Sequence, residues 1–249
     1  MQMPPVASPA PSSPIAPSID DTTLPGLRLP VIDGLPDATS PALPTRRFGG
    51  PPAPGSAAAK ADMAAVKAAQ LLRTPEGDAW ARHMAKDGAA RIWFDLARRQ
   101  QGLTGTVQTW LGVALLASTL ASNAAVTAVA KHHFDRLRPF QVDPTIHPPI
   151  APPGGASYPS GHASSAFAAA RVISVLRPEL ADEAYGLARQ VAASRVYAGV
   201  HFPSDVVAGA ALGTAIGELA LRQVGRSGMA PGELAAAANA VADEVFAGA

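Results

Sequence analysis

A chain of 249 residues with 48% apolar composition is long enough to bury a substantial core, so we expect a globular protein. Its 20 Lys and Arg against 19 Asp and Glu give a formal net charge of +1, which lacks the cationic excess typical of nucleic-acid binding. The chain has no cysteine, which excludes disulfides and Cys-ligated metals, and its alanine-rich, aromatic-poor composition favours closely packed helices over sheets.

The first 56 residues hold 14 of the 25 prolines, a density that is incompatible with a helix or a sheet. We interpret residues 1–56 as a Pro-rich, flexible and extended arm or linker, and residues 57–249 as the folded domain. The Leu, Val and Ile residues within 24–44 indicate that this part of the arm lies along the domain surface. No signal peptide is visible, because residues 1–17 have neither a basic region nor a continuous apolar run.

From residue 57 onward, helix-stop signals divide the chain. Thr74 followed by Pro75 is typical of a helix start, and Pro139 predicts the end of a preceding helix. The expected fold is all-α, a compact bundle of about seven helices. The segments predicted to be helical are 57–73, 75–99, 106–138, 160–176, 179–199, 203–224 and 231–247.

An uncharged run at residues 100–130 is long enough to span a bilayer. Polar residues such as Gln108, Thr119 and Asn123 interrupt it, and the next such run, at 206–217, is too short to cross. Charges are frequent in the two helices predicted within 57–99. We therefore expect a buried helix at this run and no stable membrane insertion.

The stretch KHHFDRLRP, residues 131–139, carries two cations at helical spacing. Lys131 and Arg138 are seven residues apart, or two helical turns, so on one continuous helix both would project from nearly the same face. Their shared partner would be an anion. The alternative is a solvated helix end whose cations complement the C-terminal dipole.

The stretch ASYPSGHAS, residues 156–164, places a His behind a Ser-Gly pair. Ser160 can cap a helix, and Gly161 lets a ligand approach the backbone, so that the first N–H groups of the helix point at an anion. His162 would then lie in the first helical turn, beside that anion. The alternative is a routine N-cap with a His that has no part in chemistry.

The stretch SRVYAGVHFPSD, residues 194–205, combines a cation, a His and a carboxylate. Asp205, four residues after His201, can accept a hydrogen bond from one ring nitrogen and so leave the other nitrogen as a base or nucleophile. Arg195 adds a cation near the end of the preceding helix. The alternative is an ordinary loop His with an Asp that stabilises a helix N-terminus.

These three clusters are chemically complementary, because they combine cations and neutral donors with two His residues. They predict a phosphate site without a metal. In order along the chain, Lys-x6-Arg-Pro, Pro-Ser-Gly-His and Ser-Arg-x5-His-x3-Asp resemble the signature of the type 2 phosphatidic acid phosphatase superfamily. That superfamily includes bacterial class A non-specific acid phosphatases and vanadium haloperoxidases. The eleven matching positions are Lys131, Arg138, Pro139, Pro159, Ser160, Gly161, His162, Ser194, Arg195, His201 and Asp205.

The resemblance implies a metal-independent acid phosphatase, a phosphoric monoester hydrolase that needs no cofactor. His201, oriented by Asp205, would attack phosphorus to form a phosphohistidine, and His162 would protonate the leaving alkoxide and then activate water. The pH optimum would lie near the unperturbed His pKa of about 6.5 or below. The residues expected to hold the phosphate oxygens are Lys131, Arg138, Ser160, Gly161 and Arg195.

The motifs look closest to those of the soluble class A enzymes, which implies small phosphomonoester substrates, inhibition by vanadate, a periplasmic or secreted location and a homo-oligomer. Two other activities within the superfamily remain as alternatives, a vanadium-dependent haloperoxidase and a lipid phosphate phosphatase. A non-enzymatic phosphate-binding protein is a third alternative, disfavoured because both His residues are present. The resemblance covers residues 131–205 and does not reach the arm.

Other conspicuous side chains are interpreted as structural. His132 and His133 are adjacent on a helix and point about 100° apart, so they cannot share a metal from one face. The three tryptophans fit amphipathic helix faces and are predicted to belong to the core, and two aromatic residues that flank the clusters are assigned to packing. These five aromatic residues are Trp80, Trp93, Trp110, Tyr158 and Phe202.

Overall fold

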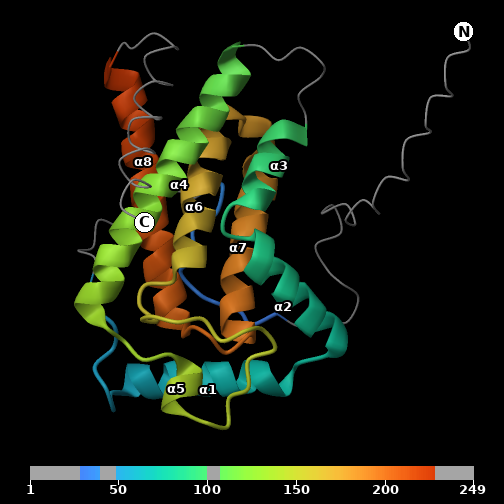
Figure 1. Cartoon of the computed structure of the whole chain (residues 1–249), viewed down its shortest axis with the longest axis vertical. Coiled ribbons are helices and arrows are strands. Elements are labelled where there is room, and N and C mark those ends of the chain that lie inside the picture. The colour runs from blue at the N-terminus through green and yellow to red at the C-terminus, as the bar shows by residue number, and fades with distance from the viewer. Residues whose placement is uncertain (1–28, 40–48, 100–106, 228–249) are drawn as a thin grey trace, which may run out of the picture.

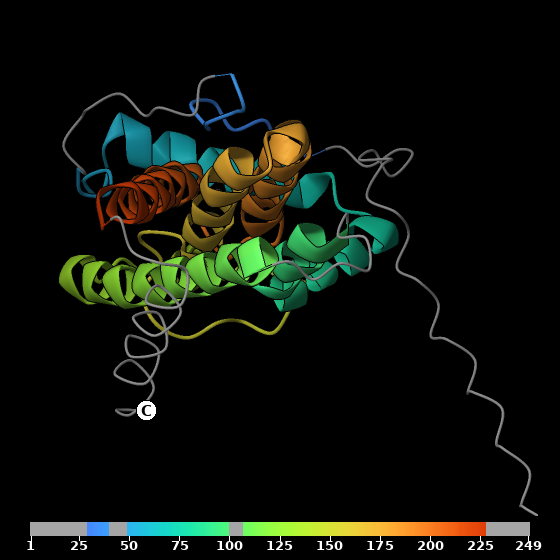
Figure 2. The same ribbon diagram turned by 90° about the horizontal axis from the view of Figure 1, so that it is seen from above.

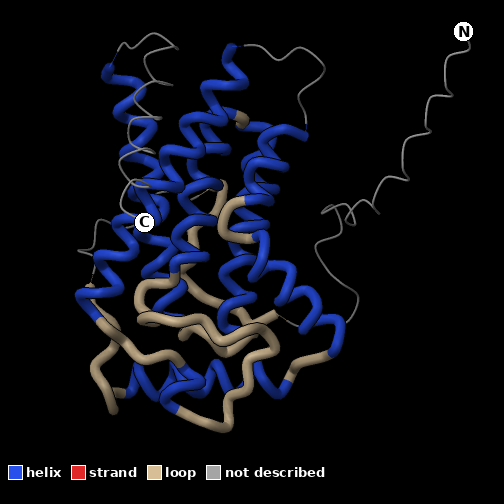
Figure 3. Tube along the Cα trace, in the orientation of Figure 1, coloured by secondary structure: helices blue, strands red, loops and turns tan. Residues whose placement is uncertain are grey.

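The computed structural model describes residues 29–39, 49–99 and 107–227, and all regular secondary structure within these ranges is helical (Figure 3). The all-α prediction is therefore confirmed, with seven helices of nine residues or more in the described part. The predicted helix at 231–247 and most of the predicted arm lie outside the described residues. The helices are α1 (Ala57–Leu71), α2 (Pro75–Asp87), α3 (Arg91–Arg99), α4 (Val107–Phe134), the single turn α5 (Pro139–Val142), α6 (Gly161–Leu176), α7 (Ala181–Tyr197) and α8 (Pro203–Ser227), with a 3-10 turn at Pro178–Leu180.

The α6 helix forms the centre of the bundle. It packs against α4, α7 and α8, while α1 crosses one end of these helices and α2 packs on α7 (Figure 1). Seen from above, α4 lies along one side of the bundle (Figure 2). The largest fully buried side chains include Trp93 of α3, Phe167 of α6 and Tyr185 of α7, so the core lies between α6 and its neighbours.

The predicted helix at 75–99 is two helices, which corrects the sequence-based expectation. Gly88 caps the end of α2, and a Cβ atom there would lie 2.4 Å from the Met84 carbonyl oxygen and 3.1 Å from Val191. The Trp93 indole then donates to the Gly88 carbonyl at 2.9 Å. Glycine therefore fits at this helix end, where a side chain would clash with the Met84 carbonyl oxygen and crowd Val191 of α7.

The predicted helix at 106–138 ends early, at Phe134, which is a second correction. Asp135 has a φ of 42°, in the left-handed region that ends helices, and Arg138 is extended as the N-cap of α5. Pro139 fixes that extended conformation of the residue before it and starts α5. The prediction that Lys131 and Arg138 share one helix face is therefore wrong. The two side chains approach each other from two different elements.

Three glycines allow α8 to cross α6 at unusually close range. Cβ atoms built on Gly209, Gly213 and Gly217 would lie 2.4, 1.9 and 2.9 Å from backbone oxygens of α6 or its N-cap. Only glycine permits this approach. At the end of this contact the Ser160 amide donates to the Asp205 carbonyl oxygen at 2.9 Å. The crossing thus places the start of α6 beside the start of α8.

The α4 helix is only half buried, which corrects the expectation of a buried helix. Its inner face carries Leu116 and Leu120, and the Asn123 amide that donates to Ser165 of α6 at 3.1 Å. Its outer face exposes alanines together with Val126 and Val129. The sequence could not separate these two faces, because both are uncharged.

Two stretches, Gly112–Val142 and Pro203–Gly225, are long and apolar enough to cross a membrane by length and composition. The second is longer than the uncharged run at 206–217, because the helix includes Asp205, Glu218 and Arg222. By length and composition, α8 is therefore a candidate span, although the uncharged run within it is too short to cross.

Part of the Pro-rich segment contacts the bundle. Ile32, Leu35 and Ala38 pack against the core, and Arg189 of α7 donates to the Pro36 carbonyl at 3.4 Å.

Candidate active site

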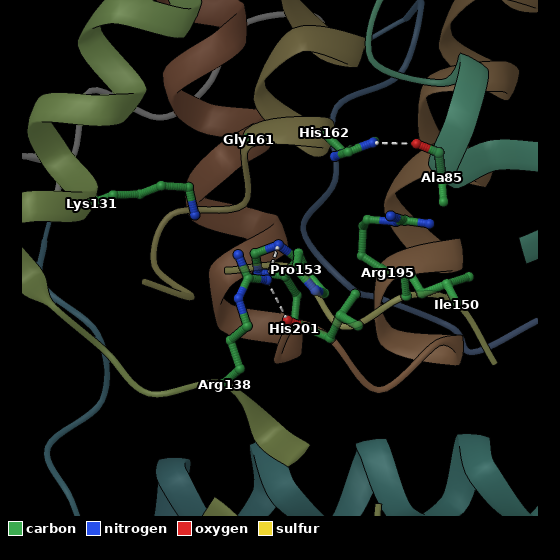
Figure 4. A pocket seen from close by; sticks show the side chains of 11 residues that line it. Ala85, Lys131, Arg138, Ile150, Pro153, Gly161, His162, Arg195 and His201 are labelled. Carbon is green, nitrogen blue, oxygen red and sulfur yellow. Dashed lines mark hydrogen bonds between the residues drawn. The ribbon is translucent and has the colours of Figure 1, made fainter. Parts of the chain in front are cut away.

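The three sequence clusters converge on one cavity of about 270 Å³ at the end of the bundle where α4, α6, α7 and α8 meet (Figure 4). Six of the eight predicted site residues line it, and Ser160 and Asp205 lie behind them. The remaining wall comes from α2, from the loop between α5 and α6, and from Val200 in the loop between α7 and α8. The lining residues are Lys131, Arg138, Gly161, His162, Arg195 and His201, with Ala85, Ile150, Ala151, Pro153 and Val200.

His201 is buried and presents its two ring nitrogens to different partners. Nδ1 lies 3.5 Å from Oδ2 of Asp205 and 3.4 Å from the Ser157 hydroxyl. Nε2 lies 3.1 Å from Nη1 of Arg138, and because a guanidinium can only donate, Nε2 is the unprotonated nitrogen. Burial lowers the pKa of His201 to about 3, in spite of the opposing effect of Asp205. The neutral ring therefore holds its lone pair on the nitrogen beside the cavity.

Asp205 accepts hydrogen bonds at both carboxylate oxygens. Oδ2 accepts from the Ser157 hydroxyl at 2.5 Å and the Phe202 amide at 2.8 Å, and Oδ1 accepts from Arg136 at 2.6 Å. Burial opposes ionisation of this carboxyl, but the hydrogen bond with His201 and the positive charge of Arg136 outweigh it and hold its pKa below the ordinary value. Asp205 is thus a carboxylate whose orientation is fixed from several sides.

Arg138 lies deep in the site and is held by backbone oxygens. Nε donates to Gly155 at 3.0 Å, Nη1 to Val200 at 2.9 Å, and Nη2 to Gly154 and Ala156 at 3.1 and 3.3 Å. Together with the contact to His201, these bonds engage all five N–H groups of the guanidinium. Arg138 must therefore exchange at least one of these bonds before it can donate to a ligand.

Lys131 and Arg195 flank the cavity from opposite sides (Figure 4). The Lys131 ammonium donates to the Ala156 carbonyl at 2.6 Å, and burial together with the charge of Arg138 lowers its pKa to about 8. Arg195 donates to the Ser194 hydroxyl at 3.0 Å and to the Ala81 carbonyl at 3.4 Å, and burial and Arg138 lower its pKa to about 10. An anion in the cavity would offset the repulsion of Lys131 and Arg195 by Arg138, which contributes to both lowered pKa values.

The start of α6 has the predicted cap. The Ser160 hydroxyl accepts from the Ala163 amide at 3.4 Å, while the Ser160 amide is already bonded to Asp205. The Gly161 amide occupies the first turn of α6, where N–H groups lack intrahelical partners, and it borders the cavity. The Gly161 amide is thus available to an anion, whereas the Ser160 amide is not.

His162 is oriented by α2, a helix that the sequence motifs do not include. Its Nε2 lies 3.0 Å from the Ala85 carbonyl oxygen, and because a carbonyl only accepts, Nε2 carries the proton of the neutral ring. Burial and the nearby charge of Arg195 lower the pKa of His162 to about 4, against the smaller opposing effect of the Ala85 bond. A pKa of about 4 makes His162 neutral at pH 6.5, whereas the role expected from the sequence requires it to be protonated.

Sequence reasoning missed four contributors to the site, Ser157, Arg136, Asp62 and the carbonyl end of α2. Ser157 and Arg136 lie inside the quoted stretches, where a hydroxyl and a third cation were the available signals. Asp62 of α1 is 6% exposed and pairs with Arg136, 74 residues away in the sequence. No local pattern could indicate that contact.

Comparison with known proteins supports this grouping of residues. Residues 111–229, just under half of the chain, match the family described as the PAP2 superfamily. The matched segment contains all eleven signature positions and the helices that carry them. This segment of the chain is therefore similar to the PAP2 superfamily, and the relatives described below are phosphatases.

The similarity to individual proteins is partial. Over 134 residues, about half of the chain, it is 33% identical to lipid A 1-phosphatase of Porphyromonas gingivalis and 32% identical to a non-specific acid phosphatase of Salmonella typhimurium. These alignments cover 27% and 52% of the two relatives, so the chain spans about a quarter and about half of their lengths.

A solved structure supports the fold over a larger part of the chain. It is the transmembrane PAP2 type phosphatidylglycerolphosphate phosphatase from Bacillus subtilis, with 25% identity and a TM-score of 0.54 over 70% of this chain and 89% of that one.

Proposed function

We propose that this protein is a phosphatase that hydrolyses phosphomonoesters through a phosphohistidine formed on His201. One observation carries the proposal: Nε2 of His201, unprotonated, borders a cavity that is also lined by Lys131, Arg138 and Arg195. A lone pair held beside three cations matches the needs of a nucleophile that attacks an anionic phosphate. The ionised Asp205 behind Nδ1 stabilises the positive charge that the ring gains on attack.

The first step transfers the phosphoryl group to the ring. The Nε2–P bond forms as the ester P–O bond breaks, and the leaving oxygen takes a proton from His162. The hydrogen bond from Arg138 must leave Nε2 before this attack, and a phosphate oxygen is the natural new acceptor for that donor. Lys131, Arg195 and the Gly161 amide are placed to hold the other oxygens.

The second step releases the phosphate. Neutral His162 takes a proton from water as the water oxygen bonds to phosphorus, and the N–P bond then breaks to return neutral His201 and inorganic phosphate. The protonated His162 is thereby restored for the next turnover. A bound phosphate anion supports this cycle, because its charge raises the low pKa that burial and Arg195 impose on His162.

The substrate class has two candidates. The motifs favour small phosphomonoesters and a soluble acid phosphatase in the periplasm or outside the cell, independent of metals and inhibited by vanadate. A lipid phosphate phosphatase is the second candidate, because Ile150, Ala151 and Pro153 give the cavity an apolar rim and two stretches are long and apolar enough to cross a membrane.

A substrate panel tests the proposal. We expect wild type to release phosphate from p-nitrophenyl phosphate with or without chelator, and His201→Ala to lose at least about 1,000-fold in kcat because the nucleophile is gone. Vanadate should inhibit wild type. An enzyme inactivated by chelator, or one that keeps its activity in His201→Ala, would refute the scheme. Two measurements separate the two candidates. One is the ratio of kcat/KM for glycerol phosphate to kcat/KM for phosphatidic acid in mixed micelles. The other is whether the protein fractionates into a detergent-free supernatant.

A further inference from the structure

A chain of ion pairs runs from α1 to the site through Arg136. Nη1 of Arg136 donates to Oδ1 of Asp205 at 2.6 Å, and Nη2 donates to Oδ2 of Asp62 at 2.8 Å. The three side chains are 12%, 0% and 7% exposed. One guanidinium is thus shared by two nearly buried carboxylates, and it is the link between them.

The surroundings of Arg136 hold it in a single orientation. Its guanidinium carbon lies 4.0 Å from the centre of the Phe202 ring, and Nη1 also donates to the Ser204 hydroxyl at 2.8 Å. Ser204 in turn donates to Asp62 through its hydroxyl and, at 3.1 Å, through its amide. The loop that follows Phe134, the start of α8 and α1 are therefore joined at this point.

The link bears directly on His201 because of how the oxygens of Asp205 are divided. Oδ1 faces Arg136, so Oδ2 is left to face Nδ1 of His201 and to accept from Ser157 and Phe202. Rotation of this carboxylate would break the contact with Arg136 together with those made by Oδ2. A buried carboxylate without its counter-charge is also costly, and His201 is the adjacent group that can compensate it by taking up a proton.

We propose that Arg136 is a positioning residue for the Asp205–His201 pair and that Asp62 holds Arg136 in place from α1. This inference rests on the proposed function of His201 as the nucleophile. Arg136 does not line the cavity, so its part in the reaction is exerted through Asp205. Asp62 lies outside residues 111–229, the segment that matches the PAP2 superfamily, so α1 is assigned a part in the site.

Three variants and a matched control test the proposal in the full chain. Arg136→Gln removes both the positive charge and the guanidinium group. Arg136→Lys keeps the charge but cannot bridge both carboxylates. Asp62→Asn keeps the shape of the side chain without its charge. The control is Arg171→Gln, which breaks a 2.6 Å ion pair between Arg171 of α6 and Glu218 of α8, away from the cavity. Thermal unfolding establishes that each variant is folded at the assay temperature.

In Arg136→Gln we expect kcat for p-nitrophenyl phosphate to fall about 10- to 100-fold, the loss typical of a misplaced reacting group. KM should change less than about threefold, because the residues that hold the phosphate are intact. Arg136→Lys should recover part of the loss, Asp62→Asn should lose less than Arg136→Gln, and their combination should be non-additive. Arg171→Gln should retain wild-type kcat. A purely structural role would instead lower the melting temperature of Arg136→Gln and leave kcat of the folded fraction unchanged.

A second readout does not depend on activity. We expect the NMR titration of the His201 ring, assigned with His201→Gln, to move to higher pH in Arg136→Gln. The freed charge of Asp205 then favours the imidazolium, while Lys131 and Arg138 still oppose it. Unchanged kcat together with an unchanged titration overturns the inference. A shifted titration in a protein that releases no phosphate from any ester supports the positioning role and contradicts the proposed function.

Discussion

The two site histidines differ in whether their lowered pKa suits their proposed role. In the proposed reaction His201 is the unprotonated nucleophile, and burial favours this role by lowering its pKa to about 3. In the same proposal His162 gives a proton to the leaving group, yet burial and the charge of Arg195 lower its pKa to about 4. The acid is therefore formed only when an anion enters the site, so substrate binding and protonation of His162 are linked.

This linkage predicts different pH profiles for the free and the bound enzyme. In this proposal protonated His162 is the active form, so kcat/KM should rise as pH falls from 6.5 towards 4. The corresponding rise in kcat, which reports the pKa of His162 in the bound enzyme, should lie at higher pH because bound phosphate raises that pKa. Initial rates of wild type and His162→Asn across pH check this prediction. The rise in rate that follows protonation of His162 should be absent from the variant. If both wild-type profiles turned at about 6.5, the linkage would be wrong.

At the scale of elements, the site depends on the close crossing of α6 and α8. That crossing puts the Ser160 cap against the Asp205 backbone and so sets the two catalytic stretches side by side. The tightest point is Gly213, where a Cβ atom would lie 1.9 Å from the Ser164 carbonyl oxygen. Backbone cannot yield there without moving one of the two helices.

Gly213→Ala is therefore expected to lower the free energy of unfolding by about 1–3 kcal/mol or more, as overpacking does. Gly225→Ala, in the same helix, meets nothing within 4 Å and should instead raise it by about 0.5–1 kcal/mol through helix propensity. Urea denaturation of both variants measures the difference. Equal and small effects at the two positions would mean that the crossing is looser than described.

The motifs predicted the site better than they predicted the elements that carry it. Six of the eight residues chosen from the three clusters line one cavity, because each local stretch holds its own cap or turn chemistry. The break after Phe134 was missed, since nothing near Asp135 marks a left-handed residue and the helical period continues to Arg138. Long-range contacts were missed because no local pattern indicates them. Arg136 contacts Asp62 and Asp205, which lie 74 and 69 residues away in the sequence.

At the scale of the whole molecule, the site is assembled from more of the chain than its family segment. Residues 57–99 contribute the Ala85 carbonyl that orients His162, the Ala81 carbonyl that receives Arg195, and Asp62. The all-α class followed from composition, but the exposed apolar face of α4 did not. Alanines that pack a core and alanines that face outward read alike in a sequence.

The central claim is that His201 carries phosphate during turnover, and trapping the intermediate tests it most directly. Wild type mixed with labelled p-nitrophenyl phosphate, or another ester that it cleaves, is quenched in alkali, where phosphohistidine survives, and the peptide containing His201 is analysed by mass spectrometry. We expect a phosphate on His201 in wild type and on no residue in His201→Ala. An active wild-type enzyme whose His201 never acquires phosphate would contradict it.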